Sequence, residues 1–157
     1  MTPYIPYAWQ PMGSVIEIPT STHRRRLNVL GFLNRRNDLY PYVMEGKVDT
    51  PVIVECFNQF STQINKRTYV LLDNSPLHRS QEFIRHIPQW VKRGLIIKYL
   101  PPYSPELNLI EILWRFIKYH WLPFSAYRSF PGLVQAVEDI LTRFDTDYTI
   151  NFQVTRV

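Results

Sequence analysis

The chain has 157 residues, enough for one domain with a hydrophobic core. With 45% hydrophobic and 15% aromatic residues, its composition is that of a globular protein and not of a disordered one. The single Cys56 excludes an internal disulfide and a cysteine metal cluster. A net charge of +5 favours a polyanionic partner without requiring one. The sequence has neither an apolar run of the roughly 20 residues a membrane helix needs nor a signal-peptide pattern, so we expect no membrane association and a cytoplasmic location.

The first part of the chain predicts a meander of strands. Its strands are expected at 15–18, ended by Pro19, at Leu27–Leu33 and at Leu39–Met44, with a polar turn at 34–38. The densest basic cluster, His23 to Arg26, precedes the second strand.

Helices and strands then alternate. A helix is predicted from Thr50 to Ile64. Thr50 would be its N-cap and Pro51 its first helical residue. The further expected elements are a strand at 68–73, a helix at 79–93 broken at Pro88, a strand at 95–99, a helix from Asn108 that stops before Pro123, a helix from Pro131, and a possible strand at 148–154. Strands followed by alternating helices and strands predict an α/β fold, with a mixed sheet and helices on both faces.

Asp73 is the first candidate functional residue. The run Thr68-Tyr-Val-Leu-Leu-Asp-Asn74 reads as a buried strand that presents Asp73 at its carboxyl end, where open α/β sheets usually carry their sites. The alternative is structural, because Asp and Asn commonly close turns after strands.

Glu111 is the second candidate. Pro101, Pro102 and Pro105 stiffen the loop before it, and Asn108 is a suitable N-cap. Ile110, Leu113 and Ile117 share one face of the following helix, whereas Glu111, Trp114, Arg115 and Lys118 share another. Here too a structural alternative exists, since Glu111 stands where a capping-box acid would stand.

These two motifs together resemble a known family. Asp73-Asn74-x-x-x-His78, followed by Pro-Pro-Tyr-Ser-Pro-Glu-Leu-Asn-Leu-Ile-Glu111 with Trp114 and Lys118, is similar to the DDE endonuclease domain of mariner-superfamily insertion-sequence transposases. The similarity extends from about Tyr7 to about His120. By this resemblance Asp73 matches the second catalytic acid and Glu111 the third. The sequence departs from the family in two places, with Glu106 where relatives often have Asp and Leu109 where they often have Pro.

The resemblance also implies a fold and the extent of the domain. It implies an RNase H-like fold, with 1–157 as a single, N-terminally truncated endonuclease domain that lacks its first strand. The family's first acid lies on that strand, upstream of a segment seen here as Tyr7 to Gly13.

The activity implied is metal-dependent cleavage and strand transfer of DNA. Mg²⁺ or Mn²⁺ would be held by Asp73 and Glu111, because paired divalent ions bridged by carboxylates can perform this chemistry. The partner would be double-stranded DNA, as transposon ends and target, with self-association left open. Because the first acid is absent, we expect this chain alone to be inactive. The rival hypothesis is an inactive DNA-binding or interaction module on the same scaffold, and an RNase H-like nuclease for another substrate is a weaker third.

Further residues are assigned supporting roles. Asn74, His78 and Asn108 are expected beside the two acids, although His78 could equally only pack against the edge of the sheet. Glu106 is the nearest acid that could be confused with Glu111. Trp114 is expected to form a wall or part of the core. Candidate phosphate contacts are the basic residues Arg24, Arg25, Arg26, Arg115 and Lys118, although basic turns are usually only solvated.

Overall fold

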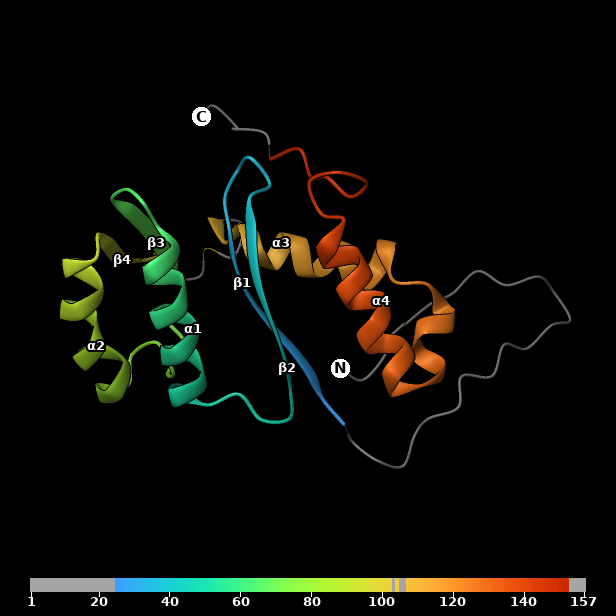
Figure 1. The fold of residues 1–157 in the computed structure, drawn as a ribbon, viewed down its shortest axis with the longest axis horizontal. Coiled ribbons are helices and arrows are strands. Elements are labelled where there is room, and N and C mark those ends of the chain that lie inside the picture. The colour runs from blue at the N-terminus through green and yellow to red at the C-terminus, as the bar shows by residue number, and fades with distance from the viewer. Residues whose placement is uncertain (1–24, 103, 105–106, 153–157) are drawn as a thin grey trace, which may run out of the picture.

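The computed structural model describes residues 25–102, 104 and 107–152. The elements in these ranges alternate much as the sequence predicts (Figure 1). They are β1 (Leu27–Leu33), β2 (Leu39–Glu45), α1 (Thr50–Gln63), β3 (Thr68–Leu72), α2 (Gln81–Lys92), β4 (Leu95–Tyr99), α3 (Leu109–Phe116), the π-helical turn η2 (Ile117–Trp121), the 3-10 helix η3 (Phe124–Arg128) and α4 (Phe130–Thr142). Among these described residues, none of the helices has the length and apolar character to cross a membrane.

β1 and β2 form an antiparallel hairpin, as predicted, with Leu27 opposite Glu45 and Leu33 opposite Leu39. The side chain of Asn34 stabilises the turn, because its Oδ1 accepts hydrogen bonds from the backbone N–H groups of Arg36 and Asp38. The strand expected at 15–18 lies outside the described residues.

β3 and β4 form a parallel pair joined by α2, with Thr68 opposite Leu95 and Leu72 opposite Tyr99. The carboxyl ends of both strands therefore lie at the same edge, next to Asp73. Instead of the single mixed sheet that was predicted, the described residues form two separate two-stranded sheets. The tail at 148–152 contributes only a bridge between Phe144 and Tyr148, so the expected strand is not formed over these described residues.

Two predicted helix details are wrong. The N-cap of α1 is Asp49 and not Thr50, since the Asp49 side chain accepts a hydrogen bond from the N–H of Val52. α2 continues through Pro88 instead of breaking there. An interior proline costs about 3 kcal/mol, but Phe83 and Trp90 are both completely buried, and each contributes about 2–3 kcal/mol of hydrophobic stabilisation.

Two hydrophobic clusters lie on opposite sides of the β1–β2 hairpin, and helices cover both sides (Figure 1). The α1–α2 core contains the buried residues Phe32, Ile53, Val54, Phe57, Phe60, Leu72, Phe83, Trp90 and Leu95. The α3–α4 core contains Leu27, Leu113, Ile117, Leu133, Val137, Ile140, Leu141, Phe144 and Ile150.

The hairpin contributes to both clusters because side chains alternate along a strand. Gly31 lets α3 approach β1 closely, since a Cβ there would lie 3.1–3.4 Å from side-chain atoms of Leu39, Ile110 and Trp114.

Candidate active site

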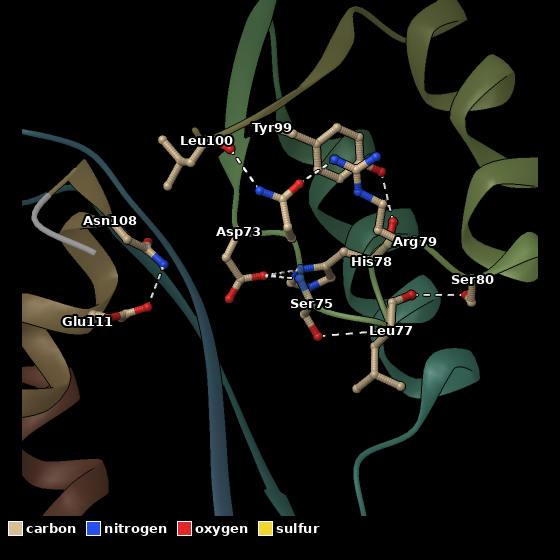
Figure 2. Close-up of polar contacts among 11 residues, drawn as sticks. Asp73, Ser75, Leu77, His78, Arg79, Ser80, Tyr99, Leu100, Asn108 and Glu111 are labelled. Atoms are coloured by element: carbon tan, nitrogen blue, oxygen red, sulfur yellow. Dashed lines mark hydrogen bonds and ion pairs between the residues drawn. The ribbon is translucent and has the colours of Figure 1, made fainter. Parts of the chain in front are cut away.

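Asp73 directly follows β3, at the edge where the β3 and β4 ends meet (Figure 2). Its Oδ1 accepts a hydrogen bond from the N–H of Ser75 at 3.0 Å and lies 2.8 Å from Nδ1 of His78. The turn-closing interaction considered as an alternative is therefore present. It occupies only one oxygen, however. The side chain is 47% exposed, and its other oxygen has no hydrogen-bond partner among the described residues, so it can approach a ligand.

His78 is held in place from several directions. Its side chain is only 17% exposed and its ring packs against Phe83, with 5.6 Å between ring centroids. The hydroxyl of Tyr99, at the end of β4, donates a hydrogen bond to the backbone carbonyl of His78 at 2.8 Å. Backbone and ring are thus both fixed, and the ring is presented to Asp73.

A second set of contacts ties the Asp73 turn to the start of the proline loop (Figure 2). The Asn74 amide donates to the carbonyl of Leu100 at 2.9 Å, and the Arg79 guanidinium donates to Oδ1 of Asn74. Arg79 also lies over the Tyr99 ring, 4.2 Å from its centroid, a favourable cation–π geometry. Sequence reasoning did not assign Arg79 or Tyr99 to the site. The signal available was the rule that parallel strands end at one edge, applied to β4 as well as to β3.

Glu111 is an exposed residue in the first turn of α3. Asn108 is the N-cap by position, but its side chain accepts no capping hydrogen bond from the described backbone. Instead, its amide donates to Oε1 of Glu111 at 3.1 Å (Figure 2). Neither half of the predicted capping box is formed in this arrangement, so the Glu111 carboxylate is not committed to the helix backbone.

A cavity of about 780 Å³ separates β1 from β3. Asp73 and His78 line it from the β3 side, whereas Asn108 and Trp114 line it from the α3 side. Trp114 therefore serves as a wall, as predicted. Asp73 and Asn108, the N-cap residue that contacts Glu111, therefore line the same cavity.

The predicted phosphate-binding residues that the structure describes precede β1 or lie in α3 and η2. Arg24 and the competing acid Glu106 lie outside the described residues. Arg25 pairs with Glu45 at 2.6 Å and lies over the Phe130 ring, an exposed interaction that contributes little stability. Arg26 and Arg115 are exposed, and Nζ of Lys118 lies 5.0 Å from the Tyr119 ring centroid.

The candidate ligands are of the kind that a hard divalent cation binds, but too few of them come together. Asp73 and Glu111 offer carboxylate oxygens, which Mg²⁺ prefers. Among the described residues, however, no three His, Cys, Asp or Glu side chains come together as a metal site. Cys56 is not a substitute ligand, because burial raises the pKa of its thiol and disfavours the thiolate.

Comparison with known proteins identifies the family. A family model described as DDE superfamily endonuclease matches residues 1–133. The match covers most of the chain, which therefore belongs to the DDE superfamily of endonucleases.

Other similarities are weaker. The uncharacterized protein y4pE/y4sA of Sinorhizobium fredii is 34% identical over 44 residues, which is 28% of this chain and 33% of that protein. A chain in the structure of the simian T-cell lymphotropic virus intasome, in complex with PP2A regulatory subunit B56 gamma, aligns over 80% of this chain and 55% of its own length. It has a TM-score of 0.40 and 14% sequence identity, which is too low to indicate a shared function.

Proposed function

We propose that this chain is the catalytic domain of a DDE-type DNA transposase, of the mariner-superfamily insertion-sequence kind, and that it performs metal-dependent strand cleavage and strand transfer. The observation that carries the proposal is the placement of Asp73. It stands at the carboxyl end of β3 beside His78 and faces the cavity that Asn108, the partner of Glu111, also lines. Membership of the DDE endonuclease superfamily supports the reaction class.

In this mechanism Asp73 and Glu111 would hold Mg²⁺ or Mn²⁺. Bound divalent ions would supply an activated oxygen nucleophile and stabilise charge on the leaving oxygen. The chain's own contribution is orientation. His78 fixes one oxygen of Asp73, and Asn108 directs the carboxylate of Glu111. Fixing the carboxylates in advance lowers the reorganisation needed when DNA binds.

We also propose that the fold is RNase H-like, with its central first strand and first catalytic acid missing from this sequence. The cavity between β1 and β3 supports this proposal, because it lies where such a strand would join the two small sheets. On this basis the chain alone does not cleave DNA.

A non-catalytic DNA-binding or interaction module is the second candidate. The lack of a three-ligand cluster among the described side chains favours it for the isolated chain. Activity in an extended polypeptide distinguishes the two candidates.

The test is a nicking assay on supercoiled plasmid with Mg²⁺ and with Mn²⁺. It compares the chain with an extended polypeptide whose upstream segment supplies an apolar strand ending in Asp. We expect cleavage only by the extended polypeptide. Asp73→Asn and Glu111→Gln should each lower it on the order of 100-fold or more, because each removes several kcal/mol of metal and transition-state stabilisation. Glu106→Gln is the matched control and should retain most activity. An inactive extended polypeptide, or activity that survives Asp73→Asn, would contradict the proposal.

Binding to double-stranded DNA, without base specificity, is a separate part of the proposal. Phosphate contacts release counterions, so affinity should fall steeply between about 50 and 200 mM salt. Arg115→Ala should flatten this dependence more than Arg25→Ala, because Arg25 is already paired with Glu45. A salt-independent affinity would argue against phosphate binding.

A further inference from the structure

One end of the cavity between β1 and β3 carries cationic, aromatic and amide side chains. The β1–β2 turn and the segment between α1 and β3 both reach this end, on the upper side of the view in Figure 1. The lining residues that these segments contribute are Asn34, Arg35, Asp38, Tyr40, Gln63, Asn65, Lys66 and Tyr69. Asp73 follows Lys66 along a largely extended segment, so at ~3.3 Å per residue the two lie roughly 20 Å apart. This group is therefore separate from the proposed catalytic Asp73.

The cations at this end lack an acidic partner among the described residues. Arg35 and Lys66 are exposed, and neither belongs to an ion pair in the part of the chain that the structure describes. Arg36 and Arg67, the next residues along the chain, are exposed as well. Asp38 is the one carboxylate among the lining residues here, and its Oδ2 accepts a hydrogen bond at 2.6 Å from an amide of the same turn. The local charge is therefore positive, which favours an anionic ligand.

The backbone around both cations is held by hydrogen bonds. In the β1–β2 turn, Oδ1 of Asn34 accepts hydrogen bonds from the N–H groups of Arg36 and Asp38. Before β3, the hydroxyl of Thr68 donates to the carbonyl of Lys66 at 3.0 Å. A ligand would therefore meet its cations on segments that are already ordered, which lowers the cost of ordering the chain on binding.

Two exposed tyrosines lie among these cations. The exposed fraction is 57% for Tyr69 and 43% for Tyr40, and both residues line the cavity. The Tyr40 ring also packs edge-on against Phe60, with 5.2 Å between ring centroids, so its position is supported by the α1–α2 core. Every nucleic-acid base has a π-face that can stack on such a ring. Exposed aromatic rings between unpaired cations thus match a ligand that carries both phosphates and accessible bases.

We propose that this end of the cavity binds single-stranded nucleic acid, with phosphates at Arg35 and Lys66 and unstacked bases on Tyr40 and Tyr69. Proteins that bind single strands without sequence preference combine a positive groove with aromatic stacking platforms in this way. A duplex fits less well, because its bases are stacked inside it and cannot reach the rings. The proposal requires neither metal nor cleavage, and its residues differ from those assigned to duplex binding above. It can therefore hold or fail independently of the proposed transposase activity.

Fluorescence anisotropy of a labelled thymidine strand of about 12 nucleotides, added to the full chain, tests the stacking contact. Tyr69→Ala should weaken binding of this strand at least about fivefold, the lower end of the effect of losing one base–aromatic stack. Tyr69→Phe keeps the ring and should weaken binding little. Phe124→Ala is the matched control, because it removes an exposed aromatic ring in η3, and it should leave the affinity unchanged.

A second pair of variants tests the phosphate contact. Arg35→Gln and Arg128→Gln lower the net charge equally, but Arg128 lies in η3 and does not line the cavity. Only Arg35→Gln should reduce the slope of log affinity against log salt, by about 0.7 for one phosphate contact of a single strand.

Two further probes define the ligand. A duplex of the same length should bind Tyr69→Ala as well as it binds the unmodified chain. A uridine strand distinguishes RNA from DNA, and the proposal holds for whichever strand loses affinity on Tyr69→Ala.

Three results would overturn the proposal: no binding of either strand, a duplex that loses as much affinity as the strands on Tyr69→Ala, or equal effects of Arg35→Gln and Arg128→Gln. The second result would mean that the surface binds duplex phosphates, and the third that only the net charge matters. Circular dichroism checks that each variant is folded. If Tyr69→Ala does not fold, the comparison of Arg35→Gln with Arg128→Gln still decides.

Discussion

The two candidate acids come from opposite sides of the β1–β2 hairpin, and the two sides hold them differently. Asp73 belongs to the α1–α2 side, where His78, Ser75 and the β4 end fix its turn. Glu111 belongs to the α3–α4 side, where Asn108 is the one described side chain that forms a hydrogen bond with its carboxylate. One acid is therefore positioned by a local network, whereas the other depends on how α3 packs against β1. The relative placement of the acids is a property of the hairpin between them.

The largest expected effect tests whether the two cores are separate. Trp90 is fully buried in the α1–α2 core and donates a hydrogen bond to Asn58. Trp90→Ala should cost about 3–5 kcal/mol of the free energy of unfolding, measured in urea. Leu113→Ala, at a fully buried position of the α3–α4 core, is the matched variant and should cost about 2–5 kcal/mol. If the cores are separate, each variant accelerates hydrogen exchange mainly on its own side. A uniform acceleration in both would show a single cooperative core.

Much of this fold could be predicted from the sequence, because hydrophobic periodicity reports burial directly. The apolar segment Leu27–Leu33 forms a strand as predicted, and Leu113 and Ile117, which the helical spacing places on one face, are both buried. Local rules failed where tertiary packing outweighed them, as at Pro88, which lies inside α2 because Phe83 and Trp90 are buried on either side.

Less of the candidate site than of the fold could be predicted from the sequence. Asp73 and His78 could be placed together, since they lie close in sequence after a recognisable strand. Tyr99 could be placed there only by applying the rule for the ends of parallel strands to β4 as well, and its contact with Arg79 depends on the parallel register of β3 and β4.

An intermediate effect is expected at the contact that joins the two sides. Gly31→Val would place atoms against Leu39, Ile110 and Trp114, each within 3.1–3.4 Å of the new Cβ. Overpacking of this kind should cost about 1–3 kcal/mol, and Gly31→Ala, with a single methyl group, should cost less. Urea unfolding measures both values. A neutral Gly31→Val would mean that α3 moves away from β1 easily, which would leave the position of Glu111 poorly fixed.

Substitutions at the helix caps of the two sides should change the free energy of unfolding by smaller amounts. Ser80 caps α2 by accepting a hydrogen bond from the N–H of Phe83, whereas the Asn108 side chain bonds to Glu111. Ser80→Ala should therefore cost about 1 kcal/mol, and Asn108→Ala only a few tenths. Thermal unfolding compares the two variants. An equal loss in both would show that Asn108 caps α3 in solution and is not kept free to orient Glu111.

The smallest effect is expected at Tyr42, on the hairpin face that packs against the α1–α2 core. Its hydroxyl is buried without a hydrogen-bond partner among the described residues, and burial raises its pKa above the ordinary value of 10.0. Tyr42→Phe should be neutral or should stabilise the protein by up to ~1 kcal/mol, because it removes an unsatisfied polar group. The raised pKa sets the sign of the pH dependence. The unfolded chain loses its proton first, so wild-type stability is complete below pH 10 and falls as pH rises through the folded pKa. Urea unfolding at pH 8 and near pH 10.5 should therefore show a larger advantage for Tyr42→Phe at the higher pH. A clear destabilisation at pH 8 would mean that the hydroxyl has a partner in solution, and that this face of the hairpin is not a dry part of the core.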